Sequence, residues 1–221
     1  YVSYVANVQL LGGVAVKISV SSDNGFKINV DDIKKSISPR TKGIILNYPA
    51  NPTGATIDEE TLRLIAGLAE ENNLIVISDE LYSAIIYGKR HFSIVRIPGM
   101  KERTIYLNGF SKSHAMTGWR LGYVAGPETI VSMMLNPPVH RPVRPVYIAA
   151  AAVEAIRKGE KDVRLMIDEY FRRRNFIANS FNEMGLACPM PEGAFYVFPD
   201  ISATGLDSRS FALDLLKKEK V

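Results

Sequence analysis

The sequence has few of the residues on which disulfide frameworks and metal sites depend. Its 221 residues include one cysteine, Cys188, and three histidines, His91, His114 and His140. A single cysteine excludes an intrachain disulfide, and a chain without disulfides is typical of a reducing compartment such as the cytoplasm. The histidines are too scattered for a metal-ligand motif, so we expect no metal site.

Long apolar runs and a strong charge of one sign are also missing. The longest apolar run, residues 146–153, is far shorter than the roughly 20 residues of a membrane span. Lysine and arginine total 27 against 23 acidic residues, so the net charge is only +4. The densest basic cluster, residues 172–174, lies in an expected helix and is typical of a solvated face. We therefore expect neither a membrane nor a nucleic acid as partner.

Strands and helices are expected to alternate along the chain. The hydropathy pattern predicts strands at residues 14–20, 43–48, 74–78, 104–108 and 122–125, and helices at 31–36 and after a capping box at 56–59. This alternation predicts an α/β fold with a mostly parallel sheet flanked by helices, and the nearly continuous apolar strands indicate cover on both faces.

The second half of the chain is expected to lead into a smaller domain. Helices are predicted at 146–157, 161–186 and 208–218, and a strand at 195–198. We expect a large domain over residues 1–160, then a linking helix and an incomplete α+β domain over 161–221. Because the chain begins at Tyr1 without a methionine, we expect a fragment of a longer polypeptide.

A polar turn after the apolar run 104–107 carries Lys112 and, eight residues later, Arg120. A lysine at the end of a strand can serve as a covalent amine, and the planar fork of an arginine suits a phosphate. The pair indicates a site for pyridoxal phosphate (PLP), an aldehyde that bears a phosphate. Taken alone, a surface lysine and a surface ion-pair arginine would be the simpler interpretation.

Two further motifs follow apolar runs, at the point where each expected strand ends. Residues 47–54 read NYPANPTG and residues 78–82 read SDELY. The ligand crevice of an open α/β sheet lies at the carboxyl ends of its strands. Alone, Asn51 would be a turn residue, Asp79 a capping carboxylate and Tyr82 a core position, but together with Lys112 they favour a site.

In this order the three motifs resemble the class I/II aminotransferases, which are fold type I PLP enzymes, and the resemblance covers essentially the whole chain. It implies that Lys112 forms the Schiff base and moves a proton, and that Asp79 pairs with the pyridine nitrogen. It also implies further cofactor contacts, with a cis bond before Pro52: Tyr82 and Asn51 to the 3′ oxygen, Arg120 to the phosphate, and Tyr1 stacked on the ring.

The sequence departs from the family pattern at two places. Gly109 stands where many members have a phosphate-binding serine, and whether Ser111 compensates is left open. The proline-rich stretch 140–145 replaces a serine-bearing segment near the family's dimer interface. We hypothesise that Arg141 or Arg144 reaches a substrate carboxylate across that interface; a surface-loop arginine is the alternative.

The resemblance implies a homodimeric aminotransferase that moves the amino group of an L-amino acid, aspartate or aromatic, to a 2-oxo acid. Two alternatives stay open. One is a PLP-dependent β-elimination (carbon–sulfur) lyase on the same fold, because a fold does not determine a reaction. The other is a non-catalytic fragment, because the family's phosphate-binding loop and carboxylate-binding arginine lie outside these 221 residues.

Overall fold

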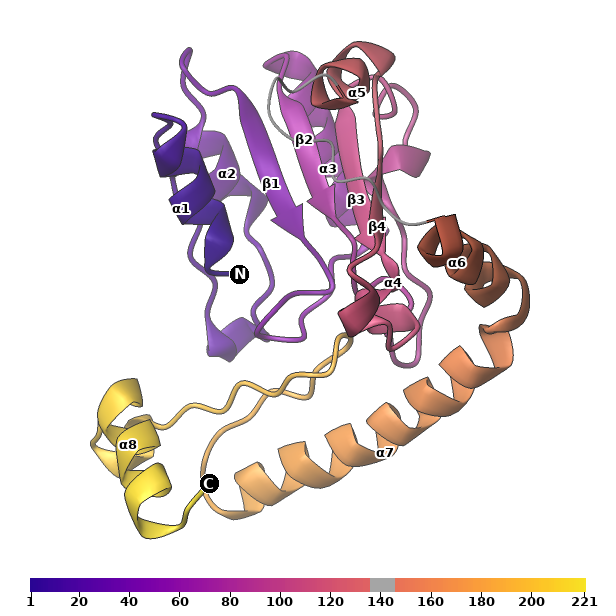
Figure 1. Ribbon diagram of the computed structural model, residues 1–221. Helices are drawn as coiled ribbons and strands as arrows, with labels where there is room; N and C mark the ends of the chain where they lie inside the picture. Colours follow the sequence, from indigo (N-terminus) through magenta and orange to yellow (C-terminus); the bar gives the residue numbers. More distant parts are fainter. Residues whose placement is uncertain (136–145) are drawn as a thin grey trace.

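A four-stranded sheet forms the centre of the molecule in the computed structural model, which describes residues 1–135 and 146–221 (Figure 1). Its strands follow the order β1-β2-β3-β4. The first three pair in parallel and β4 is antiparallel to β3. Their bounds are Gly43–Asn47 for β1, Ile75–Asp79 for β2, Thr104–Gly109 for β3 and Gly122–Ala125 for β4. The predicted α/β fold with a mostly parallel sheet is therefore confirmed.

Eight α-helices surround or extend from this sheet in the described residues. α7 leads away from the sheet toward α8, and the segment between them turns back to the sheet before it reaches α8 (Figure 1). The bounds of the helices are α1 Ser3–Leu10, α2 Val30–Ser36, α3 Glu59–Glu71, α4 Phe110–Ser113, α5 Glu128–Leu135, α6 Val146–Lys158, α7 Glu160–Glu183 and α8 Ser208–Lys218. Short 3₁₀ turns lie at Ser22–Asn24 (η1), Ile94–Arg96 (η2), Thr117–Trp119 (η3) and Ser202–Thr204 (η4).

The main core lies between one face of the sheet and helices α2 and α3. The apolar face predicted for α3 is buried, with Ile65 and Ala69 fully inaccessible against Val76 of β2. α3 starts two residues later than predicted, because Asp58 caps it: its Oδ1 accepts the backbone N–H of Thr61 at 2.7 Å. The capping-box prediction, with Thr56 as the cap, is therefore wrong.

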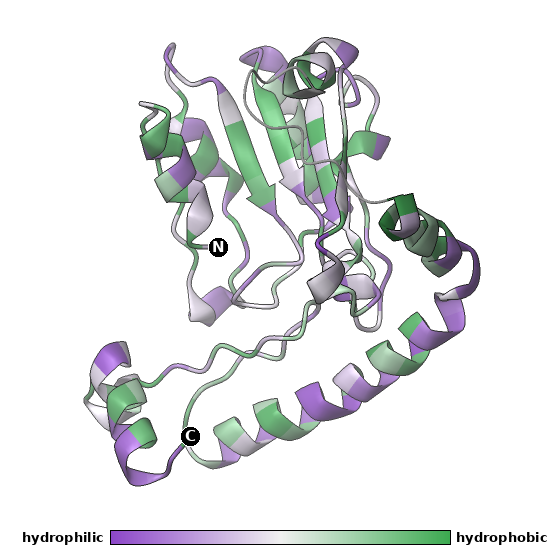
Figure 2. Cartoon of the chain, in the orientation of Figure 1, coloured by the Kyte–Doolittle hydropathy of each residue, from purple (hydrophilic) through white to green (hydrophobic). Residues whose placement is uncertain are grey.

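The opposite face of the sheet is more open than the apolar strands indicated. Ile45 of β1 and Val124 of β4, whose side chains lie on this face by strand register, are 37% and 42% exposed. Strand β2 alternates between buried and half-buried residues, as expected when one face packs more tightly than the other. Figure 2 shows apolar residues on β1 to β3 and alternating apolar and polar residues along α7.

Two predicted strands are absent from the described structure. Residues 14–20 have no regular secondary structure and pair with no strand, and Val14 is 87% exposed. Residues 195–198 also have no regular secondary structure, and nearby an isolated bridge joins Ile86 to Gly193. Alternating hydropathy defines two faces of a segment, but a strand also needs a neighbour that accepts its backbone hydrogen bonds.

None of the helices in residues 1–135 and 146–221 is both long and apolar enough to cross a membrane. The same residues contain no group of three or more acidic, histidine or cysteine side chains placed to hold a metal ion. Arg141 and Arg144 lie outside the described residues, so their proposed reach to a substrate remains a prediction.

Candidate active site

The predicted site residues lie at the carboxyl ends of the parallel strands. Asn47, the last residue of β1, pairs in register with Asp79, the last residue of β2, and Asp79 pairs with Leu107 of β3. Helix α4, which carries Lys112, begins directly after β3. Parallel strands thus bring the three sequence motifs to one edge of the sheet, as the sequence predicted.

Arg120 reaches the same edge through the pairing of β3 with β4. Gly109 pairs with Gly122, so the two ends of the loop between them lie side by side. This loop carries both Lys112 and Arg120. Arg120 is exposed, in the left-handed conformation (φ 53°), and its Nη1 donates to the carbonyl of Thr117 at 3.3 Å. Among the described residues no carboxylate lies within ion-pair distance of it, which leaves its guanidinium available to an anion.

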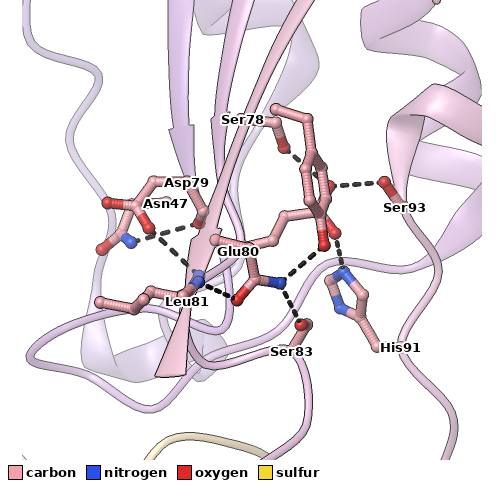
Figure 3. Close-up of polar contacts among 11 residues, drawn as sticks. Asn47, Ser78, Asp79, Glu80, Leu81, Ser83, His91 and Ser93 are labelled. Atoms are coloured by element: carbon pink, nitrogen blue, oxygen red, sulfur yellow. Dashed lines mark hydrogen bonds and ion pairs between the residues drawn. The ribbon is translucent and has the colours of Figure 1, made fainter. Parts of the chain in front are cut away.

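The Asp79 carboxylate is held by two donors. Its Oδ1 accepts the backbone N–H of Leu81 at 3.2 Å, and its Oδ2 accepts the hydroxyl of Tyr4 at 2.5 Å. Burial, and after it the hydrogen bond to Asp79, raises the pKa of Tyr4, so the tyrosine keeps its proton and acts as donor. Asn47 Nδ2 donates to the carbonyl of Asp79 at 3.4 Å (Figure 3).

Sequence reasoning missed both Tyr4 and Asn47 as partners of Asp79. Tyr4 follows Tyr1 by three residues in the same aromatic run, and Asn47 is the first residue of the NYPANPTG motif. Because both residues belong to segments already assigned to the site, their position in the sequence could have marked them as candidates. Their contacts with Asp79 span 75 and 32 residues of sequence and depend on the fold.

Lys112 is half-buried beside two aromatic rings. Its Nζ lies 5.9 Å from the centroid of the Tyr82 ring and 5.6 Å from that of Phe195. These distances suit a weak cation–π attraction, which keeps the amine near Tyr82. Phe195 comes from the segment after α7 and was not predicted as a site residue.

Tyr82 is buried, and its hydroxyl lies 2.6 Å from that of Tyr196. Burial, and after it the contact with Tyr196, raises the pKa of Tyr82, which therefore stays protonated at neutral pH. Phe195 packs edge-on against Tyr82, with ring centroids 5.3 Å apart. Tyr196 is thus a second aromatic neighbour that the sequence did not single out.

Asn51 and Tyr1 meet at the rim of this site. The N-terminal amine of Tyr1 donates to the carbonyl of Asn51 at 3.2 Å, and the backbone N–H of Asn51 donates to Oδ1 of Asn47 at 3.2 Å. The bond before Pro52 is cis, as the resemblance implied, and the bond before Pro49 is cis as well. The ring of Tyr1 is exposed and meets the Tyr4 ring edge-on at 5.6 Å.

A second polar cluster lies beside the site but faces away from it. Glu80 is only 2% exposed, and its carboxylate accepts the hydroxyls of Ser78 and Ser93 at 2.9 and 2.6 Å and contacts Nε2 of His91. The groups bonded to Asp79 and those bonded to Glu80 lie on opposite sides of the strand end (Figure 3). The buried Glu80 therefore bonds to groups on the side of the strand end that faces away from the site.

A comparison with known families decides what this arrangement belongs to. The family model described as Aminotransferase class I and II matches residues 1–221. The chain belongs to this family. It is 45% identical over 225 residues to an aspartate aminotransferase of Pyrococcus abyssi (strain GE5 / Orsay), and 43% identical over 225 residues to aromatic-amino-acid aminotransferase 2 of Thermococcus litoralis.

These relatives are longer than the chain. Each of the two alignments covers 100% of this chain but 58% of the relative. The crystal structure of an aromatic aminotransferase from Pyrococcus horikoshii OT3 superposes with a TM-score of 0.94 at 44% identity, covering 99% of this chain and 59% of that one. The chain therefore spans less than two thirds of the length of these aminotransferases.

Gly109, the departure from the aminotransferase pattern, has a steric explanation. A Cβ at this position would lie 2.9 Å from the Cα of Gly122 and 3.0 Å from the carbonyl oxygen of Leu121. Both atoms are backbone at the start of β4, so a serine could enter only if that strand moved. Ser111 is half-buried, and its carbonyl accepts the hydroxyl of Thr117 at 3.0 Å.

Proposed function

We propose that this chain carries the PLP-binding part of an aminotransferase, which moves the amino group of an L-amino acid to a 2-oxo acid. Aspartate and aromatic amino acids are the favoured donors, because the relatives named above are aspartate and aromatic aminotransferases. The observation that carries the proposal is the placement of Lys112 and Asp79 at the ends of neighbouring strands. A covalent amine and a fixed carboxylate are thereby set at one edge of the sheet.

The chemistry of the side chains fits PLP. A carboxylate oxygen can accept more than one hydrogen bond, so Asp79, although held by Tyr4 and Leu81, can still accept one from a protonated pyridine nitrogen. The guanidinium of Arg120 is the natural partner for a phosphate, and the amine of Lys112 for an aldehyde. Tyr82 keeps a proton that it can donate to the 3′ oxygen of PLP. Asn51 would be the second contact of this oxygen, and Tyr1 would stack on the PLP ring.

Bound PLP would supply an electron-withdrawing ring that accepts the charge left when the Cα–H bond of the substrate breaks. Lys112 would hold the cofactor covalently in the resting protein. Once substrate has displaced it, Nζ of Lys112 would take the Cα proton of the substrate and deliver it to C4′ of the cofactor. Asp79 would keep the pyridine nitrogen protonated, and Arg120 would anchor the phosphate.

The proposal extends to assembly and location. We place the active protein as a homodimer, which the resemblance implies, in the cytoplasm. The single cysteine, Cys188, is free and buried, which agrees with a reducing compartment. The division into a large domain (1–160) and a linking helix with part of a small domain (161–221) belongs to the same proposal.

The first experiment is an absorption spectrum of the purified protein with added PLP, before and after borohydride. We expect a yellow Schiff-base band that borohydride traps on Lys112, and no such band in Lys112→Ala. Lys161→Ala, which removes an exposed lysine on α7, is the matched control and should keep the band. If the wild type forms no Schiff base, the proposal is wrong and the interpretation as a non-catalytic fragment is favoured.

A second experiment separates transamination from elimination. Amino donors are supplied with and without a 2-oxo acid, and the products are analysed. An aminotransferase needs the 2-oxo acid for turnover, whereas a β-elimination lyase releases ammonia and pyruvate without it. Steady release of ammonia in the absence of an acceptor would contradict the proposed reaction.

A further inference from the structure

Two phenols from distant parts of the chain share one hydrogen bond at the site. The hydroxyls of Tyr82 and Tyr196 lie 2.6 Å apart although 114 residues separate them in sequence. Tyr82 follows β2, whereas Tyr196 belongs to the extended segment after α7. Each hydroxyl has one proton to donate and two lone pairs that accept.

The direction of this bond decides where the proton of Tyr82 points. If Tyr82 donates to Tyr196, its only proton is used and none remains for a ligand. If Tyr196 donates, Tyr82 keeps its proton for another acceptor. A PLP molecule bound here would offer such an acceptor, its 3′ oxygen, and the second arrangement would then satisfy all three groups.

We propose that Tyr196 is a positioning residue: its hydroxyl donates to Tyr82 and thereby directs the Tyr82 proton to the 3′ oxygen of PLP. This inference rests on the proposed function, in which Tyr82 contacts that oxygen. Tyr196 touches neither PLP nor substrate in this scheme and acts only through Tyr82. Because burial raises the pKa of Tyr82, the phenol stays protonated and can perform this role at neutral pH.

The position of Tyr196 is fixed by backbone contacts with the NYPANPTG motif and with the segment that follows the SDELY motif. The N–H groups of Glu192 and Gly193 both donate to the carbonyl of Gly54, each at 2.9 Å, and the N–H of Ala194 donates to Ile85 at 2.9 Å. Gly54 is the last residue of NYPANPTG and has φ +68°, and a Cβ there would lie 2.5 Å from Pro191. The close approach therefore depends on glycine.

Aromatic packing also restricts the two phenol rings. Phe195 lies 5.3 Å from the Tyr82 ring and 4.8 Å from the Tyr196 ring, between centroids, and its ring is 5.6 Å from Nζ of Lys112. The Tyr82 and Tyr196 rings themselves meet at 5.6 Å, nearly perpendicular at 72°. Because both rings are held in this way, the contact between the two hydroxyls has little freedom to rearrange. Its loss should therefore change the position of the Tyr82 hydroxyl.

The test is the pKa of the Schiff base in the PLP-loaded protein, measured from its absorption as a function of pH. A proton donated to the 3′ oxygen stabilises its anionic form and lowers the pKa of the imine. Tyr196→Phe keeps the ring and removes only the hydroxyl, so it should raise the imine pKa by about 0.5 to 1 unit, the size of one net hydrogen bond. An unchanged or lowered imine pKa would overturn the inference.

The matched control is Tyr87→Phe. Tyr87 is buried, and its hydroxyl donates to the carbonyl of Ala194 at 2.7 Å, so this variant also removes a hydrogen bond that holds the same segment. Among the described residues no hydrogen bond joins Tyr87 to the Tyr82 hydroxyl, so this variant should leave the imine pKa unchanged. If Tyr87→Phe raises the pKa as much as Tyr196→Phe, general loosening of the segment is the cause and the inference fails.

A double variant shows whether Tyr196 acts through Tyr82. In a Tyr82→Phe background, Tyr196→Phe should cause no further change, because the group it positions is gone. Additive shifts would contradict a positioning role. A wild-type protein that forms no Schiff base would refute the proposed function and this inference together, whereas a wild-type Schiff base with an unaltered pKa in Tyr196→Phe would refute this inference alone.

Discussion

The phenol of Tyr4 donates a hydrogen bond of 2.5 Å to the carboxylate of Asp79, joining helix α1 to the end of strand β2. α1 has no buried residue, and both this contact and the Tyr1–Asn51 contact attach the start of the chain to the site. A hydrogen bond to a charged group is stronger than one between neutral groups. Tyr4 should therefore hold Asp79 in the orientation that faces the cofactor.

Tyr4→Phe should weaken PLP binding by about 3- to 10-fold, part of the strength of one hydrogen bond to a charged group. The dissociation constant is measured by titrating PLP and following the Schiff-base absorbance. Tyr147→Phe, at an exposed tyrosine on α6, is the control and should bind as the wild type does. If the Tyr4 variant and the control bind PLP with equal affinity, Tyr4 does not contribute to PLP binding.

Arg120→Ala should weaken PLP by about 10- to 100-fold, because a charge-assisted pair with the phosphate is lost. Pyridoxal, which has the aldehyde but no phosphate, should bind both proteins alike. Comparing the two ligands isolates the phosphate contact from any change in folding. Arg40→Ala, at an exposed arginine before β1, should affect neither ligand. A similar loss for PLP and pyridoxal would show that Arg120 acts in another way.

His91→Ala should lower the free energy of unfolding by about 2 kcal/mol, because it removes one of the hydrogen-bond partners of the buried Glu80 carboxylate. Chemical denaturation gives this value directly. In a Glu80→Gln background the same substitution should cost less, since the hydrogen bond between the carboxylate and His91 is already lost. Lys35→Ala breaks a solvent-exposed pair with Asp32 and should have little effect. A His91 variant as stable as this control would contradict the role of the cluster.

Asp58→Ala should cost about 1 kcal/mol of stability and Asp58→Asn much less, because asparagine also caps helices. The backbone hydrogen bond from Thr61 lowers the pKa of Asp58 in the folded protein. A carboxyl whose pKa is lowered by folding stabilises the fold above its usual pKa of about 4. This contribution is lost as the pH falls through the lowered value.

Denaturation at several pH values tests this sign. The difference in stability between the wild type and Asp58→Asn should be constant at neutral pH and should shrink at acid pH. A difference that grows on acidification would contradict the assignment of Asp58 as the cap of α3.

The strands that build the site could be predicted because each combines an apolar run with a polar end. β1, β2 and β3 all begin and end within a residue or two of the predicted limits, and α3 buries the side that its periodicity indicated. The rule that parallel strands end at one edge then placed Asp79 and Lys112 together. The prediction of a strand at 14–20 was wrong, because a hydropathy pattern does not show whether a neighbouring strand is present to pair with it.

The sequence by itself determined the family motifs, the four strands of the sheet with α3 between β1 and β2, and the residues that carry the proposed chemistry: Lys112, Asp79, Tyr82, Asn51 and Arg120. These features depend on local patterns of a few residues, which a single chain displays directly. Only the tertiary structure decided that Tyr4 bonds to Asp79, that Tyr196 bonds to Tyr82 and that Gly109 has no room for a side chain. Those contacts join segments far apart in sequence, and their geometry is set by how the sheet, α1 and the segment after α7 pack together.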